Sequence, residues 1–582
     1  MGAPGQSRLV HLAPTKRMKS RAARQWQATA VALLSTFCVD AGALVNSSTG
    51  VYINDLIGAS AFYAAGYTGA NAIAINIEGG YGWSQHETLT QVSQFFDARA
   101  LYTANGLAAE INQLGSFDAH ATWMASALAG RGASNQQRGI AYGATLWEGA
   151  VANSFVSGST SFSWTRGYSF TAPYFDSMVT GRAGRQADVV NSSWGWNDTA
   201  GSSIFTLALD GITRSSGRTT VFSAGNSGAD TSQFWGSPGG YNSIIVGALA
   251  SNNYSSVASF SSRGPVAYAD PLGNNVAAAR ARVDIVSPGQ NITLARYGGT
   301  TGGNTGGTDP TGGATNLYTS GVFGTSEASA IVAGGATLLN DLAYGRYAGN
   351  ARAHDGEVIK AVLLNSAAKI TGWDNGQVLG GDGVVRTTRA LDYASGAGAL
   401  DLNAAFTQFT GGTNDVSGNG GGSVQTTGWD YGVLTQGTTT SYSFAQLLGA
   451  GTRLNVTLNW FVGRSFSGVD AFGNISASDD FFTNLALQVW RTDAPGGAAM
   501  VAESNAAYIN TEHLSLFLQS AGLYELRVVW TGERYDLANN ASQSFGLAWS
   551  AAAVPEPGVW TLLLAGIGVI ALRVWRARRQ DR

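Results

Sequence analysis

A serine stands where the sequence predicts the start of a long helix of small and apolar residues. Ser326 lies in the stretch "VFGTSEASAIVAGGATLL", directly after Gly324 and Thr325. A serine at a helix start can be a cap, because its oxygen accepts from the orphan N–H groups of the first turn. It can also be a nucleophile, which requires a general base, an acid that orients the base and donors for an oxyanion. The choice depends on whether those partners occur elsewhere in the chain.

Histidine is the natural base for such a serine, since its unperturbed pKa lies near neutral pH. His120, in "FDAHATWMASALAG", stands at the head of a second run of small residues that predicts a helix. A structural histidine near a helix start is the alternative reading of this residue. The chain has five histidines in all, namely His11, His86, His120, His354 and His513.

An acid and an amide donor both follow predicted buried strands. Glu78 ends the apolar run in "GYTGANAIAINIEGG", and Asn226 follows a strand in "VFSAGNSGA". Ligand and catalytic groups gather at the carboxyl ends of the strands in open parallel sheets. A carboxylate at the end of a buried strand needs a partner, because an unpaired buried charge is costly. The amide of an asparagine in a turn can donate to a developing oxyanion.

The elements that would position these residues alternate between strands and helices from about residue 50 to residue 410. The predicted strands are continuously apolar and read "AIAINI", "AYGATLW", "ADVVNSS", "TTVFSAG" and "SIIVGAL". The predicted helices cover residues 86–98, 121–130, 201–213, 326–343 and 355–367. This pattern indicates an α/β fold, a doubly wound and mostly parallel sheet with helices on both faces.

A second domain is expected after a Gly-rich linker at residues 411–425, which contains "GGTNDVSGNGGGS". Residues 426–552 alternate apolar and polar side chains in runs such as "TRLNVTLNWFV" and "YELRVVWTG". That alternation, with turn signals between the runs, predicts an antiparallel β-sandwich. No cluster of chemically able residues occurs in this region of the sequence, so we expect a stabilising or binding module.

The N-terminal end has the layout of a secretory signal peptide over residues 1–43. Basic "KRMKSRAARQW" precedes the apolar run "ATAVALLSTF" and small residues; a basic tail is the alternative. The only cysteine, Cys38, lies in this segment. The mature protein is therefore expected to have no disulfide, no cysteine nucleophile and no thiolate metal site. The net charge of −3 argues against a nucleic-acid partner.

The C-terminal end, residues 553–582, combines Pro-Glu-Pro at 555–557 with a short apolar run and terminal arginines. It resembles the PEP-CTERM sorting signal of Gram-negative bacteria. The resemblance implies a transient transmembrane segment, processing by an exosortase-type enzyme, and delivery to the cell surface or the extracellular matrix. An ordinary C-terminal membrane anchor is the alternative.

The chemically able residues also occur in a characteristic order. Between about residues 55 and 405 the chain contains, in sequence, "GYTGANAIAINIEGG", "HATWMASALAG", "RGIAYGATLW", "ADVVNSSWG", "FSAGNSG", "VASFSSRGP", "VDIVSPG", "FGTSEASAIVAG" and "GAGALDLNAA". This ordered series resembles the subtilisin-like serine proteases. The resemblance implies their doubly wound fold and a peptidase domain, which we place at residues 44–410.

The resemblance implies a role for each matching residue. Ser326 matches the nucleophile, His120 the general base and Asn226 the oxyanion donor, while Glu78 stands at the place of the acid. The main-chain N–H of Ser326, at a helix N-terminus, would be a second oxyanion donor. A peptide substrate would bind as an added strand. The segments that would hold it are Ser193-Trp194-Gly195 and Ser223-Ala224-Gly225.

Several positions depart from the family pattern. Glu78 replaces an aspartate, and although glutamate is one methylene longer it can still accept from the other ring nitrogen of the histidine. Trp123 and Ala121 replace a histidine and a glycine, and Ala330 replaces a proline. Glu327 replaces a methionine beside the nucleophile, where its charge would raise the pKa of the histidine or repel acidic substrate residues.

The sequence thus predicts an exported, surface-anchored serine endopeptidase that forms an acyl-enzyme through a Ser-His-Glu triad. Its partners would be protein or peptide substrates, and a histidine base predicts activity near neutral to alkaline pH. The alternative is a non-catalytic relative that binds peptide or matrix, which the changes at Glu78 and Glu327 favour. No cofactor is expected. Structural calcium is common in the resembled family, but no liganding loop can be assigned.

Overall fold

The computed structural model describes residues 43–553 apart from segments 133–136, 157–160, 231–239, 300–316 and 414–419. The predicted signal peptide, except its last residue, lies outside the described residues, and so does the predicted C-terminal segment, except its first residue. Within the described part of the chain, no helix is both long and apolar enough to cross a membrane.

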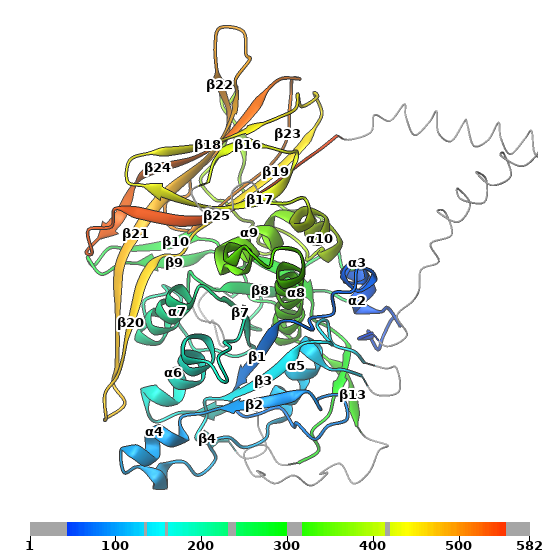
Figure 1. Cartoon of the computed structure of the whole chain (residues 1–582), viewed down its shortest axis with the longest axis vertical. Coiled ribbons are helices and arrows are strands. Elements are labelled where there is room, and N and C mark those ends of the chain that lie inside the picture. Colours follow the sequence, from blue (N-terminus) through cyan, green and yellow to red (C-terminus); the bar gives the residue numbers. More distant parts are fainter. Residues whose placement is uncertain are drawn as a thin grey trace, which may run out of the picture. The chain divides into compact units, whose positions relative to one another are not determined.

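A seven-stranded parallel sheet lies at the centre of the first region (Figure 1). Its spatial order is β11-β8-β7-β6-β1-β3-β2, and every neighbouring pair is parallel. The five apolar strands expected from the sequence are β1, β3, β6, β7 and β8. The bounds of the seven strands are β1 (Ile73–Glu78), β2 (Val92–Phe96), β3 (Thr145–Ala150), β6 (Val189–Ser192), β7 (Thr219–Ser223), β8 (Ile244–Leu249) and β11 (Ile285–Pro288).

Helices cover both faces of this sheet, as the apolar strands require. Ile73, Ile75 and Ile77 of β1 belong to a core shared with α6 and α7, whereas Ala74 belongs to a core shared with α5 and α8. Each strand is therefore buried from two sides, which confirms the predicted doubly wound α/β fold. The bounds of the main helices are α5 (Ala119–Ala129), α6 (Gly167–Phe175), α7 (Ile204–Ser216), α8 (Thr325–Arg346), α9 (Gly356–Ser366) and α10 (Leu402–Thr410).

The helix expected at residues 86–98 is wrong. The segment forms turns and then β2, which lies at the edge of the sheet and pairs in parallel with β3. Along β2 the buried Phe96 follows the exposed Phe95. Val92 and the two phenylalanines favour a half-buried strand, and the open edge of β3 supplies the backbone partners that a helix would not need.

The strand order reverses at β1. The chain places β3 and β2 on one side of β1, and then β6, β7, β8 and β11 on the other. A crevice forms at the carboxyl ends of the strands where the order of a doubly wound sheet reverses, and ligands bind there. Glu78, the last residue of β1, and Ser193, which directly follows β6, lie at this crevice.

The second region contains two packed β-sheets, as the sequence predicts. One has the order β17-β25-β19-β23. The other has the order β14-β15-β22-β21-β24-β18-β16, with β20 paired to β21; its short strands are β14 (Val378–Leu379), β15 (Val385–Thr387) and β16 (Gly422–Val424). Apolar residues of β19, β21, β24 and β25 form their common core. The longer strands are β17 (Thr427–Thr435), β18 (Thr439–Phe444), β19 (Arg453–Asn459), β20 (Gly463–Val469), β21 (Ile475–Arg491), β22 (Ala499–Ser504), β23 (Thr511–Phe517), β24 (Tyr524–Asp536) and β25 (Ser542–Ala552).

The two regions are connected by more than the linker. A short hairpin, β14 (Val378–Leu379) with β15 (Val385–Thr387), extends the larger sheet by pairing with β22. Arg464 of β20 lies 2.9 Å from Asp210 of α7 and 3.0 Å from Asp479 of β21. The domain boundaries at residues 410 and 426 remain predictions. This contact shows that the first and second regions share a buried ionic cluster.

Candidate active site

Glu78 and His120 are the first candidate residues that the structure brings together. Glu78 is the fully buried last residue of β1. His120 is in the first turn of α5, where the Asp118 side chain caps the helix by accepting from Ala121 N–H at 3.1 Å. Glu78 Oε2 lies 3.0 Å from His120 Nδ1. A carboxylate only accepts, so Nδ1 carries the hydrogen and Nε2 is left to accept another proton.

Ser193 connects this pair to Ser326. The main-chain N–H of Ser193, directly after β6, donates to Glu78 Oε1 at 2.7 Å. The carbonyl of Ser193 accepts from Ser326 Oγ at 3.0 Å. The hydroxyl of Ser193 donates to the carbonyl of Ser326, also at 3.0 Å. The candidate acid and nucleophile are therefore bonded to one residue, at the point where the strand order reverses.

The charges around His120 stabilise its protonated form. Burial favours neutral imidazole, but the Glu78 charge and hydrogen bond outweigh it, and the pKa of His120 is raised to about 9; Asp118 and Glu327 contribute to the rise. Burial raises the pKa of Glu78, against the effects of His120 and the Ser193 N–H. An imidazolium that forms when His120 accepts a proton would thus be held by a directly bonded carboxylate.

Asn226 lies in the turn after β7, beside the start of α8. Its Oδ1 accepts from the main-chain N–H of Thr325 at 2.9 Å and from the Thr325 hydroxyl at 3.1 Å. Both bonds use the amide oxygen, so Nδ2 is the group that Asn226 can offer to a ligand. The N–H of Ser326 belongs to the first turn of α8, where helix N–H groups have no acceptor within the helix. These two donors lie beside the candidate nucleophile, as an oxyanion site requires.

Glu327, the next residue of α8, is buried with 1% of its surface exposed. Burial raises its pKa to about 7, and the nearby Glu78 charge adds to the rise while His120 opposes it. Within the described residues, its Oε2 atom has no hydrogen-bond partner. The sequence marks Glu327 as unusual by its type, but only the structure shows that its carboxyl is buried among the catalytic candidates.

The two candidate substrate segments both adjoin Ser326. Ser193 contacts it directly, and Gly225 N–H donates to the hydroxyl of the preceding Thr325 at 3.0 Å. Trp194 is buried, and its indole donates to the carbonyl of Ile77 at 2.9 Å. Its ring packs in the core against Phe162, Trp164 and Phe170, whereas Gly195 is only partly buried.

The remaining described histidines have other partners. His86 Nε2 lies 2.7 Å from the carbonyl of Leu317, and His354 Nδ1 lies 3.1 Å from Asn340 Oδ1. His513 is buried in the second region with Lys369 Nζ 2.8 Å from its Nε2. His11 lies outside the described residues. Among the described residues, no group of three or more histidine, cysteine or acidic side chains could hold a metal ion.

Two supporting residues were not identified from the sequence. Asp118 caps α5, and its charge raises the pKa of both His120 and Glu78. Ser329 Oγ lies 2.8 Å from Ser193 Oγ, one helical turn after the nucleophile. A helix-capping position was the only available signal for Asp118. The i, i+3 spacing from Ser326 could have suggested Ser329.

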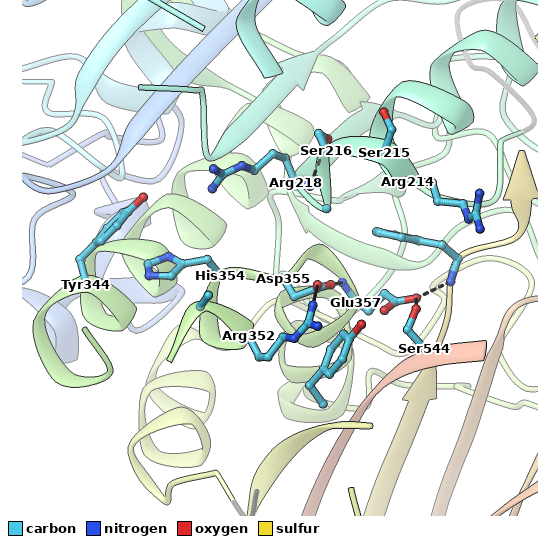
Figure 2. Close-up of a pocket in the computed structure, with 14 residues that line it drawn as sticks. Arg214, Ser215, Ser216, Arg218, Tyr344, Arg352, His354, Asp355, Glu357 and Ser544 are labelled. Atoms are coloured by element: carbon cyan, nitrogen blue, oxygen red, sulfur yellow. Dashed lines mark hydrogen bonds and ion pairs between the residues drawn. The ribbon is translucent and has the colours of Figure 1, made fainter. Parts of the chain in front are cut away.

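A pocket of about 640 Å³ lies elsewhere, between the turn after α7, the start of α9 and the second region. Figure 2 shows Asp355 beside Arg352, and Glu357 bonded to Ser544. Arg218, which also lines the pocket, directly precedes β7. The pocket is therefore at the amino ends of the strands, opposite the edge that carries Glu78, and contains none of the candidate catalytic residues.

The sequence pattern of the Subtilase family matches residues 69–386, which is more than half of the chain. The match includes all of the candidate catalytic residues and both candidate substrate segments. A second pattern, the PEP-CTERM protein-sorting motif, matches residues 553–579. This motif is a C-terminal sorting segment of exported proteins. No curated protein matches the chain.

Proposed function

We propose that this chain, which belongs to the subtilase family, is a serine endopeptidase that hydrolyses peptide bonds through an acyl-enzyme on Ser326. The observation that carries the proposal is the 3.0 Å contact between Glu78 and His120, with Glu78 tied through Ser193 to Ser326. The side chains of Glu78 and His120 bond directly, and the main chain of Ser193 connects Glu78 to the Ser326 hydroxyl, although these residues are far apart in the sequence.

In the proposed acylation step, the Ser326 hydroxyl turns from the Ser193 carbonyl toward His120. Its oxygen forms a bond to the scissile carbonyl carbon while His120 Nε2 takes the hydroxyl proton. The carbonyl oxygen becomes an oxyanion beside Asn226 Nδ2 and the Ser326 N–H. The carbon–nitrogen bond then breaks, and the leaving amine takes the proton from His120. Water then attacks the acyl carbon while His120 takes its proton. The bond between Ser326 Oγ and that carbon breaks, Oγ regains the proton, and the acid product leaves.

Glu78 would orient His120 and stabilise its protonated form, the role of the aspartate that the family usually has. The geometry supports a glutamate in this role because both carboxylate oxygens are used: Oε2 by His120 Nδ1 and Oε1 by Ser193 N–H. The second bond fixes the longer side chain against β6. Substrate would bind as an added strand along Ser193-Trp194-Gly195 and Ser223-Ala224-Gly225.

A non-catalytic subtilisin-like protein that binds peptide or matrix is the second candidate. Two observations favour it: the Ser326 hydroxyl is bonded to Ser193, and the Glu327 carboxyl is buried beside the oxyanion donors. For either function, we propose that the protein is exported, sorted by an exosortase-type enzyme through its C-terminal segment, and transiently anchored in the membrane before delivery to the cell surface or matrix.

Labelling with a fluorophosphonate tests the proposal without knowledge of the preferred substrate. The reagent forms a bond between Ser326 Oγ and phosphorus, fluoride leaves, and His120 takes the proton. We expect the full chain to be labelled and Ser326→Ala to be unlabelled. Ser366→Ala, at the end of α9, is the control and should be labelled like the wild type. A folded wild type that stays unlabelled from pH 6 to 10 would favour the non-catalytic function.

A further inference from the structure

Three polar groups face one small space beside Gly324. The position that a Cβ atom on Gly324 would occupy is 2.9 Å from Glu327 Oε2, 3.3 Å from Asn226 Nδ2 and 3.5 Å from Ser326 N. Two of these groups are the proposed oxyanion donors. A side chain at Gly324 would fill the space, so glycine keeps it open in front of all three. The third group, the Glu327 carboxyl, therefore faces the place where negative charge would develop.

The Glu327 carboxyl has no other role in the fold that the contacts reveal. It is 1% exposed, and its Oε2 atom has no hydrogen-bond partner among the described residues. An unpaired buried polar atom is costly, and an unpaired buried carboxylate costs more. The neutral acid reduces that cost, and it has an O–H that can donate.

We propose that Glu327, in its protonated form, donates a third hydrogen bond to the oxyanion. This inference rests on the proposed function, because it assigns a role in the same reaction. An ionised Glu327 would have the opposite effect, since its negative charge would lie beside the oxyanion and repel it. The same residue would therefore support the reaction when protonated and oppose it when charged.

The ionisable groups that face Glu327 are His120 from α5 and Glu78 from β1. With a His120 pKa of about 9 and a Glu327 pKa of about 7, the pair holds one proton between those pH values, mainly on His120. The reactive arrangement is the minor form with the same proton on Glu327, so His120 is neutral and Glu327 protonated. Below the window both groups are protonated and His120 cannot accept; above it both have lost their protons and Glu327 is charged. The plot of labelling rate against pH should therefore be bell-shaped, and its two apparent pKa values belong to the His120–Glu327 pair and not to either residue alone.

The test is the pH dependence of fluorophosphonate labelling by the full-length wild type, Glu327→Gln and Glu327→Ala. The wild-type rate should fall at least about tenfold from its optimum to pH 10.5. Glu327→Gln cannot ionise but keeps a donor, so its rate should not fall over the same range; it should rise to a plateau as His120 loses its proton. Glu327→Ala should also lack the alkaline limb, with a maximum at least about tenfold below that of Glu327→Gln, because it lacks the donor.

Glu357→Gln is the matched control, since it removes a buried carboxyl outside the site and should keep the wild-type bell. Circular dichroism at each pH confirms that the variants are folded. An alkaline limb that persists in Glu327→Gln would overturn the inference and leave the proposed function intact. Equal maxima for Glu327→Gln and Glu327→Ala would overturn the donor role. No Ser326-dependent labelling at any pH would overturn both proposals, because no oxyanion would form.

Discussion

The two edges of the parallel sheet both bury carboxyl groups, but they satisfy them differently. At the amino edge, Glu357 accepts from Phe461 N–H at 2.8 Å and from the Ser544 hydroxyl at 3.1 Å, both in the second region. At the carboxyl edge, Glu78 is bonded to a histidine, and Glu327 leaves one oxygen without a partner among the described residues. The first arrangement joins two regions of the protein, and the second leaves groups available to a ligand.

The comparison of Glu357 with Glu327 shows that a raised carboxyl pKa does not by itself identify a catalytic site. Burial raises the pKa of Glu357 as well as that of Glu327. The two edges differ in the groups that surround each carboxyl. Glu327 lies near a histidine, a serine and the two proposed oxyanion donors, whereas Glu357 accepts from a main-chain N–H and a hydroxyl that stabilise the fold. Substitutions at the carboxyl edge should therefore change the reaction rate, and substitutions at the amino edge should change the stability of the fold.

The largest effect should come from Glu78. Glu78→Gln keeps the size of the side chain but removes the charge that stabilises protonated His120. We expect a loss of about 10⁴-fold in the rate of labelling or peptide hydrolysis, as for the corresponding neutral substitution in a Ser-His-Asp triad. Glu78→Asp should retain far more activity. A Gln variant within tenfold of the wild type would remove the reason to place Glu78 in the triad.

Asn226 should have the next largest effect. Asn226→Ala removes the Nδ2 donor, and we expect kcat for a peptide substrate to fall about 10²–10³-fold with little change in KM; that magnitude was measured in another subtilase. The variant also loses the acceptor for Thr325 at the start of α8, so its Tm should be compared with that of the wild type to show that the fold is retained. A change confined to KM would mean that Asn226 binds the ground state of the substrate and is not an oxyanion donor.

The smallest effect is expected at the amino edge. The raised pKa of Glu357 means that the folded protein binds more protons than the unfolded chain between the ordinary value of 4.5 and the raised value. Stability from this group is therefore fully present below pH 4.5 and is lost as the pH rises through that window. Relative to wild type, Glu357→Gln should gain about 2 °C in Tm from pH 5 to pH 8. A constant Tm difference would contradict this assignment.

The sequence was sufficient where the residue pattern and the topology agree. Glu78 could be placed because it follows a continuously apolar strand, and parallel strands present their carboxyl ends at one edge. The same pattern failed at residues 86–98, because an edge strand with few buried residues has no distinct period and depends on the open edge of β3. The position of the Glu327 carboxyl near the proposed oxyanion donors could not be predicted, since it depends on the space left at Gly324 and on the direction of one side chain.

A crystal structure of the fluorophosphonate-treated protein would show the proposed active site directly. We expect phosphorus bonded to Ser326 Oγ, His120 still bonded to Glu78, and one phosphoryl oxygen within about 3.1 Å of Asn226 Nδ2 and Ser326 N. Phosphorus on another residue, or a phosphoryl oxygen directed away from those donors, would contradict the proposed active site.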